Sequence, residues 1–279
     1  MKVFKKLLSL GLVLGLTLSL VGCSGGGEKT KLEQIKDNGK LVVGTSAEFP
    51  PFEFHKVVDG KDSIKGFDIM LAEEFAKELG VKVEIKDMSF DGLIGALNAD
   101  QVDIVLAGMS PTPEREKSVD FSELYYLSRN AVIVKDADID KVKTEDDLKK
   151  LRVGVQAGSI QEEYVVNTLK MTTTKSLKAI PDLITELKNG NIDAVVTNEA
   201  VSLINVKKYD GIKMANTEVG KDVTEGMAAA IKKSDNNKDF IELLNKKIKE
   251  LQDGKKIEEF LNEASTEAAY KLVRKLCGR

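Results

Sequence analysis

The chain has 279 residues, 42% of them hydrophobic, and its 42 basic and 45 acidic side chains give a formal net charge of −3. A slightly acidic chain lacks the basic surface that nucleic-acid binding requires, so we expect no nucleic-acid partner. His55 is the single histidine, which excludes a histidine-based metal cluster. No metal or other cofactor is expected.

The first residues have the pattern of a secretory signal. Lys2, Lys5 and Lys6 precede an apolar run at 7–21, and a charged start followed by a short apolar core is typical of a signal peptide. The run is shorter than the roughly 20 residues of a membrane-spanning helix. We therefore expect residues 1–22 to be removed on secretion.

Leu20-Val-Gly-Cys23 resembles the lipobox of bacterial lipoproteins. The resemblance implies cleavage before Cys23 and lipid attachment to it, so that the chain would be anchored outside the cytoplasmic membrane by the lipid alone. The alternative is an ordinary signal peptide with a chance cysteine. Glycines after Cys23 favour a flexible tether, which we place at 23–38.

The first half of the body alternates strand and helix patterns. Apolar residues four apart, with Gly80 behind them, predict a helix over 67–79. Strands that alternate with helices predict parallel sheets. The other elements expected here are strands at 41–44, 81–85 and 103–107 and a helix at 90–97.

The second half repeats this organisation. We interpret 131–135 and 226–233 as the two crossings between a first lobe and a second. In the second lobe, helices are expected at 159–169 and 180–187 and a strand at 192–197. A long amphipathic helix at 240–251 and a shorter one at 257–261 follow.

Two stretches occur twice in altered form. LVVGTSA at 41–47 is echoed by LRVGVQA at 151–157, and VDIVLAG at 102–108 is echoed by IDAVVTN at 192–198. In the second pair a leucine stands six residues before the aspartate, as Leu97 before Asp103 and Leu187 before Asp193. This duplication predicts two similar α/β lobes facing one cleft, where the carboxyl ends of strands bind small molecules. We assign 39–128 with 225–266 to lobe 1, 129–224 to lobe 2, and 267–279 to a tail.

The block AGMSPTPEREKSVDFS at 107–122 is the strongest candidate for recognition. Pro113 starts a helical turn whose exposed backbone N–H groups attract anions, and Arg115 on that turn can hold a carboxylate through two parallel hydrogen bonds. The alternative is that Arg115 forms a surface ion pair with a neighbouring acid.

Five consecutive motifs, VGTSAEFPPFEF, GFDIMLAEEFAKELG, FDGLIGAL, AGMSPTPER and VGVQAGSIQEEY, resemble in order and spacing the polar amino-acid binding proteins of bacterial ABC importers, solute-binding protein family 3, over about residues 38–265. The resemblance implies a two-lobed, periplasmic-binding-protein-like (type II) α/β fold. It also implies an extracytoplasmic, monomeric, non-enzymatic protein that captures an L-amino acid and delivers it to an ABC permease. Because the chain has no GxxxxGK[ST] loop, the ATPase must be another subunit.

The resemblance also implies the site. In the family, two aromatic rings enclose the ligand side chain, and an arginine, a hydroxyl and backbone groups hold its α-carboxylate. The matching residues are Phe49 and Phe90 for the rings, Arg115, Ser110, Gly108 and Ile160 for the carboxylate, Ser159 as a secondary candidate, and Gln156 beside the ligand side chain.

Two departures from the family pattern affect the ligand. Asn198 stands where the family has an aspartate for the α-ammonium group, and Ser46 stands where some cation binders carry an acid. Glu199 could substitute for the missing charge, and Glu48 is the best carboxylate for a cationic side chain. We therefore lean toward arginine, lysine or ornithine, with glutamine or another polar amino acid as the close rival.

Two alternatives remain at this point. The scaffold could carry a dehydratase-type enzyme, for which Glu48 or Glu199 would have to be the general acid. It could also belong to a sensory lipoprotein whose closure signals to a partner other than a permease.

Overall fold

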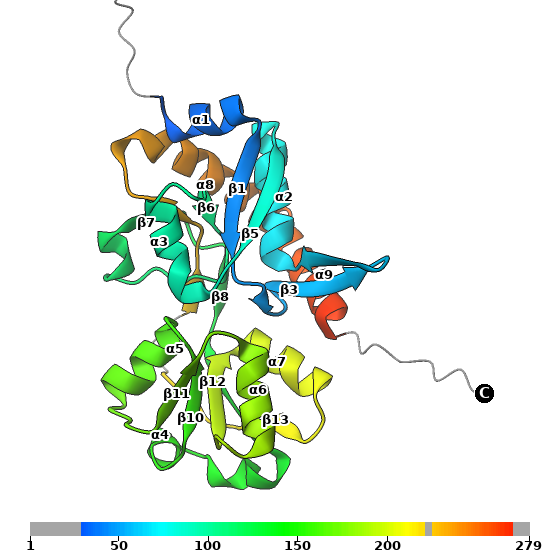
Figure 1. Cartoon of the computed structure of the whole chain (residues 1–279), viewed down its shortest axis with the longest axis vertical. Helices are drawn as coiled ribbons and strands as arrows, with labels where there is room; N and C mark the ends of the chain where they lie inside the picture. The colour runs from blue at the N-terminus through cyan, green and yellow to red at the C-terminus, as the bar shows by residue number, and fades with distance from the viewer. Residues whose placement is uncertain (1–28, 221–224, 270–279) are drawn as a thin grey trace, which may run out of the picture.

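The computed structural model describes residues 29–220 and 225–269. The expected signal peptide, Cys23, and Cys277 in the expected tail lie outside these residues. The chain folds into two α/β lobes, one above the other in Figure 1. Within the described residues, no helix is both long and apolar enough to cross a membrane.

The sheet of the upper lobe has the strand order β5-β1-β6-β15-β7. Strand β1 is parallel to β5 and β6, whereas β15 is antiparallel to β6 and β7. The strands are β1 (Lys40–Thr45), β5 (Lys82–Asp87), β6 (Ile104–Val105), β7 (Val119–Phe121) and β15 (Ala230–Lys232), and the helices α1 (Lys31–Asn38), α2 (Phe67–Leu79), η1 (Phe90–Gly92), α3 (Leu93–Asn98), η2 (Arg115–Lys117), η5 (Asp235–Asn237), α8 (Lys238–Asp253) and α9 (Lys256–Ala269).

The sheet of the lower lobe has the order β11-β10-β12-β9-β13, with β9 antiparallel to both of its neighbours. Its strands are β9 (Asn130–Lys135), β10 (Val153–Gln156), β11 (Thr174–Leu177), β12 (Ala194–Asn198) and β13 (Ile212–Met214), and its helices η3 (Asp136–Lys141), α4 (Glu145–Leu148), α5 (Ile160–Glu163), η4 (Tyr164–Thr168), α6 (Ile180–Asn189) and α7 (Glu199–Lys208).

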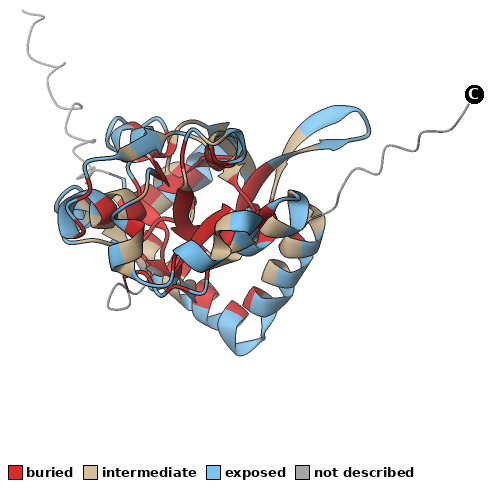
Figure 2. Cartoon of the chain, turned by 90° about the horizontal axis from the view of Figure 1, so that it is seen from below, coloured by how far each residue is buried: buried red, intermediate tan, exposed pale blue. Residues whose placement is uncertain are grey.

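Two further sheets lie outside these cores. Strands β8 (Tyr126–Ser128) and β14 (Glu225–Met227) pair antiparallel where the chain passes between the lobes. Strands β2 (Glu48–Phe49), β3 (Glu53–Val58) and β4 (Lys61–Lys65) form a third sheet, and its β3–β4 hairpin projects from the body with an exposed tip (Figure 2).

The duplicated aspartates make the same contacts in both lobes. Asp103 accepts the Val42 N–H through Oδ2 at 2.9 Å and returns its own N–H to Val42 O at 2.8 Å. Asp193 does the same with Arg152, at 3.0 and 2.8 Å. The repeated sequence therefore encodes one repeated link between two neighbouring strands.

Several expectations need correction. The sheets are mixed rather than parallel, because the strands around the two crossings run against their neighbours. Helix α1 occupies the second half of the segment expected to be a tether, and it begins with a capping box in which Thr30 and Glu33 satisfy each other's backbone N–H groups. Helix α9 extends to Ala269, well beyond the short helix expected at 257–261.

Apolar packing continues from one lobe to the other. A single cluster of buried side chains includes Phe52 and Phe75 of the upper lobe and Leu183 and Leu187 of the lower one. Helix α9 packs against α2 and α8 and also against α7 of the other lobe. The lobes are thus pressed together in this structure, with the candidate site between them.

Candidate functional site

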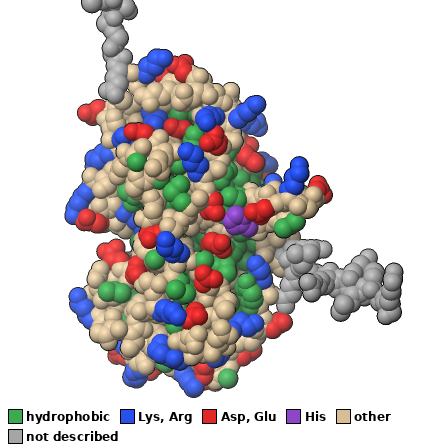
Figure 3. All heavy atoms as spheres, in the orientation of Figure 1, with side chains coloured by type: hydrophobic (Ala, Val, Ile, Leu, Met, Phe, Trp, Pro, Cys, Tyr) green, Lys and Arg blue, Asp and Glu red, His purple; other side chains and the backbone are tan. Residues whose placement is uncertain are grey.

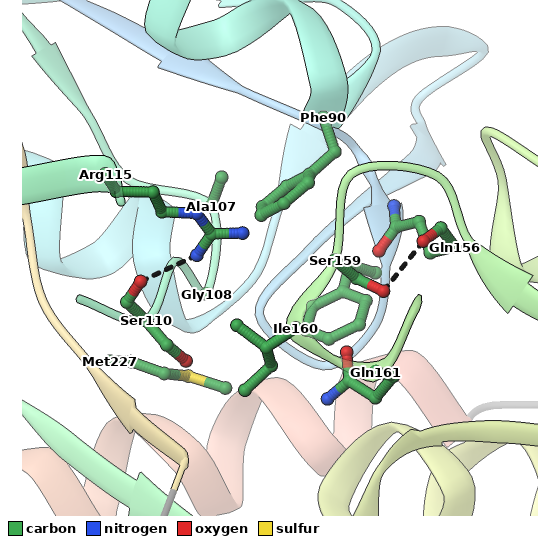
Figure 4. Close-up of a pocket in the computed structure, with 11 residues that line it drawn as sticks. Phe90, Ala107, Gly108, Ser110, Arg115, Gln156, Ser159, Ile160, Gln161 and Met227 are labelled. Carbon is green, nitrogen blue, oxygen red and sulfur yellow. Dashed lines mark hydrogen bonds between the residues drawn. The ribbon is translucent and has the colours of Figure 1, made fainter. Parts of the chain in front are cut away.

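One pocket between the lobes brings together eight of the ten predicted ligand-binding residues (Figure 4). The space that its lining encloses is about 20 Å³, which is about enough for one water molecule. Its residues are Phe49, Phe90, Ala107, Gly108, Ser110, Arg115, Gln156, Ser159, Ile160, Gln161 and Met227.

Arg115 reaches this pocket from the short helix η2. Its Nη1 donates to Ser110 O at 2.6 Å, and its Nη2 donates across the cleft to Gly158 O at 2.9 Å. The expected alternative, a surface ion pair with a neighbouring acid, does not form. Burial lowers the pKa of Arg115 to about 10, although the negative charge of Glu163 acts to raise it. The guanidinium therefore remains a cation at neutral pH.

The aromatic residues enter the pocket from separate segments. The Phe90 ring centroid lies 5.4 Å from Cζ of Arg115, a cation–π geometry. Phe49 is stacked on Phe52 with ring centroids 5.6 Å apart. Both Phe49 and Phe90 are almost completely buried, so together they give the pocket apolar walls beside a fixed positive charge.

Gly108 is required where the upper-lobe loop meets Phe49. Its φ of +55° is in the left-handed region, and a Cβ there would lie 2.9 Å from Cε1 of Phe49. Such a contact is too close for any residue with a side chain. The glycine therefore lets the backbone after β6 approach the aromatic wall.

The lower lobe contributes the segment between β10 and α5. Ser159 caps α5 by accepting the Glu162 N–H at 3.1 Å and donates its hydroxyl to Gln156 O at 2.7 Å. The Gln156 side chain donates to Lys178 O at 3.1 Å. These bonds fix the turn that carries Gly158 against the upper lobe.

Asn198 and Glu48 lie outside the pocket lining. Asn198 is fully buried, and its Oδ1 accepts the Ala200 N–H at 2.8 Å as the cap of α7. Glu199, considered as its substitute, is paired with Arg129 at 2.6 Å. Burial raises the pKa of Glu48. No acid at these positions therefore faces the enclosed space.

The sequence reasoning missed three lining residues, Ala107, Gln161 and Met227. The first two are direct neighbours of predicted residues. Met227 ends β14, and its side chain reaches the pocket because this crossing passes beside it. Sequence carries no sign of that proximity, since Met227 is more than a hundred residues from Arg115.

A second, wider groove lies beside the pocket and shares Arg115 and Ser159 with it. This groove has a volume of about 490 Å³ and includes Glu114, Glu162 and Glu163 in its lining. Glu114 is paired with Lys117, so Glu162 and Glu163 supply the acidic character of this groove beside Arg115. Acidic side chains beside the pocket favour a cation there over an anion.

His55, the single histidine, is held between two carboxylates. Its Nδ1 lies 2.8 Å from Asp62 and its Nε2 lies 3.1 Å from Asp87. Burial lowers its pKa, but the hydrogen bonds to both aspartates outweigh burial and raise it. Figure 3 shows the histidine flanked by acidic side chains. In the described ranges, no group of three or more His, Cys, Asp or Glu side chains could hold a metal ion.

Comparisons of the sequence with a family model and with known proteins agree with each other. Residues 41–264 match the bacterial extracellular solute-binding proteins, family 3. The arginine-binding extracellular protein ArtP of Bacillus subtilis is 37% identical, with 91% of this chain and 95% of that protein covered.

Two solved structures extend the comparison. The amino-acid ABC transporter substrate-binding protein AbpA of Streptococcus pneumoniae, bound to L-arginine, has a TM-score of 0.82 and 37% identity, with 86% of this chain and all of that chain covered. An ancestral arginine-binding protein bound to glutamine has a TM-score of 0.72 and 39% identity, with 81% of this chain and 97% of that chain covered. The shared two-lobed architecture agrees with the fold described above.

Proposed function

Because the chain belongs to family 3 of the bacterial extracellular solute-binding proteins, we propose that it captures an L-amino acid between its two lobes and delivers it to an ABC permease. Like its relatives, it is a binding protein and not an enzyme. One observation carries the proposal. Arg115, Phe49 and Phe90 of the upper lobe meet Gln156, Ser159 and Ile160 of the lower lobe around a single enclosed space.

The α-carboxylate of the ligand would take the place of Gly158 O at the Arg115 guanidinium. The guanidinium is oriented by Ser110 O, and its Nη2, now bonded to Gly158 O, would turn to the incoming carboxylate. Charge-assisted hydrogen bonds of this kind contribute about 1.5–3 kcal/mol each. Phe49 and Phe90 would enclose the ligand side chain.

Binding requires the lobes to separate first. The enclosed space of about 20 Å³ is far smaller than any amino acid. Residues from both lobes form its walls, so a ligand that touches both stabilises the closed arrangement. The paired strands β8 and β14 are the connection about which the lobes would rotate.

For the ligand itself we propose a cationic amino acid, with arginine first. The acidic groove beside Arg115 and the arginine bound to the Streptococcus pneumoniae relative support this choice. Glu48 does not, because it lies outside the pocket lining. Glutamine remains the rival, since the ancestral arginine-binding protein was also solved with glutamine.

We further propose that the protein is secreted and held at the outer face of the cytoplasmic membrane by lipid on Cys23. The lipobox-like sequence before Cys23 supports this assignment. We also retain the division into lobe 1, 39–128 with 225–266, and lobe 2, 129–224, and we add α1 and the end of α9 to lobe 1. The dehydratase alternative loses its general acids, because Glu48 is outside the pocket and Glu199 is paired with Arg129.

The test is a thermal-shift and calorimetry panel on the chain from residue 24 onward, with arginine, lysine, ornithine, histidine, glutamine and citrulline. A ligand that binds only the folded state raises the melting temperature. We expect arginine to give the largest shift and citrulline, its neutral analogue, a clearly smaller one. Equal shifts for the two would overturn the cationic choice but not the transport function, whereas no shift with any amino acid would overturn both.

A further inference from the structure

A pair of buried acids lies behind the pocket, on the far side of Gly108. Glu53 of β3 and Asp68 of α2 both have 0% of their surface exposed. Among the described residues, no N–H or hydroxyl group donates a hydrogen bond to either side-chain oxygen of Glu53 or to Oδ1 of Asp68. The two carboxyl groups do lie within hydrogen-bonding reach of each other.

Two ionised carboxylates cannot face each other in a buried site, because both burial and mutual repulsion oppose the charges. A single proton between them resolves the conflict, since a protonated carboxyl donates to the oxygen that would otherwise repel it. The proton belongs on Glu53, because Asp68 already accepts two other hydrogen bonds and Glu53 accepts none. The Glu53 hydroxyl therefore donates to Asp68.

The other oxygen of Asp68 connects this pair to the pocket. Asp68 Oδ2 accepts the Gly108 N–H at 2.7 Å and the Tyr125 hydroxyl at 3.0 Å. Gly108 lines the pocket, and its left-handed backbone lies directly against the Phe49 ring. Whatever holds the Gly108 amide therefore also holds the aromatic wall and the start of the loop that leads to Arg115.

We propose that Asp68 is a positioning residue of the ligand site and that Glu53 is its protonated partner: together they fix Gly108 against Phe49 in the geometry that receives the amino acid. The inference rests on the proposed function, because it concerns the same site. It predicts that Asp68 affects ligand affinity without touching the ligand.

The test uses L-arginine as the probe and three variants. Asp68→Ala removes the acceptor of the Gly108 amide, and we expect arginine affinity to fall at least tenfold. Asp68→Asn keeps an acceptor for Gly108 and gains a donor for Glu53, so affinity should stay within about threefold of wild type. Leu79→Ala is the matched control, because it creates a cavity at the opposite end of α2, about 16 Å along the helix axis from Asp68.

A second readout does not depend on any ligand. Hydrogen exchange of the Gly108 amide, followed by NMR, should be strongly slowed in wild type and in Asp68→Asn and faster in Asp68→Ala. If wild type binds no amino acid, the proposed function fails, while Gly108 exchange still decides the role of Asp68.

Two results would overturn the inference. One is an Asp68→Ala protein that keeps wild-type affinity and Gly108 protection. The other is a Leu79→Ala protein that loses as much affinity as Asp68→Ala at an equal drop in melting temperature.

If Asp68→Ala does not fold, the proposal is tested in the wild-type protein by the pH dependence of the Gly108 amide chemical shift. Asp68 faces Glu53 and Tyr125, and Asp87 acts on Glu53 at longer range. We expect the resonance to shift with pH in wild type and much less in Glu53→Gln, whose side-chain amide replaces the proton permanently. No shift in wild type, or an equal shift in both proteins, contradicts the proposal.

Discussion

Arg115 donates from Nη2 to the main-chain oxygen of Gly158 at 2.9 Å, and this bond joins the two lobes across the candidate site. Gly158 also lies against Asp91 of the upper lobe. The residue assigned to the ligand carboxylate is thus one that the closed arrangement itself uses. Ligand binding and lobe closure therefore depend on the same guanidinium.

We expect Arg115→Ala to lower the affinity for arginine by at least about 100-fold, because it removes two charge-assisted hydrogen bonds. Isothermal titration calorimetry measures the change. Lys117→Ala is the control, since Lys117 lies on the same helical turn and pairs only with Glu114 at the surface. If Arg115→Ala bound arginine as tightly as wild type does, the assignment of Arg115 to the ligand site would be refuted.

Gly158→Ala should weaken closure. The φ of Gly158 is +76°, and an added Cβ would lie 3.1 Å from Cβ of Asp91 across the cleft. We expect arginine affinity to fall roughly tenfold, because the added Cβ crowds Asp91 only when the lobes are closed, and small-angle scattering to show less compaction with ligand. The left-handed strain of about 1–2 kcal/mol is present whether the lobes are open or closed and lowers stability instead. Gly39→Ala has similar backbone strain with nothing within 4 Å of its Cβ. An equal loss of affinity in both variants would mean that closure is not the cause.

Glu48→Gln should change the affinity for arginine by less than about threefold, because Glu48 lies outside the pocket lining. Calorimetry with arginine and glutamine in parallel measures the change. The prediction fails if arginine binding drops tenfold while glutamine binding is kept, because Glu48 would then contact the cationic group in the bound state.

Stability should decrease as pH rises from 5 to 6. Burial raises the pKa of Glu53 well above its usual value, so that Glu53 keeps the one proton that it shares with Asp68. Groups whose folded pKa is raised stabilise the fold below their unfolded pKa and lose that contribution as pH rises through the folded pKa. Each retained proton gives a slope of up to about 1.4 kcal/mol per pH unit. Urea unfolding at several pH values measures this slope.

Glu53→Gln should flatten that slope. His55 has a raised pKa too, with the same sign, but its contribution is lost only above its unfolded value of 6.5, outside this pH window. A variant with the same slope as wild type would mean that Glu53 does not retain the proton.

Much of the fold could be predicted because its signals are local. The helix over 67–79 is confirmed as α2, since its apolar residues recur every fourth position and Gly80 ends it with φ of +72°. Helix α1 was not predicted, because it exposes many charged side chains and shows little apolar periodicity. The mixed sheets could not be predicted, because strand direction depends on which distant segment inserts beside each strand.

The candidate site was predictable where it follows the chain's own motifs and not where it depends on side-chain direction. Gly108, Ser110 and Arg115 lie on one loop and converge as the motif implies. The side-chain oxygen of Asn198 instead accepts a hydrogen bond from the Ala200 N–H and so caps α7. The pairing of Glu53 with Asp68 required the loop after β2 to fold back onto α2, which no short-range pattern encodes.

The pairing of Ser128 with Glu225 means that the lower lobe leaves and re-enters the rest of the chain at neighbouring points. A segment with adjacent ends is a modular insert. Because its ends are adjacent, it could be exchanged for the corresponding segment of a relative without stretching the remainder of the chain.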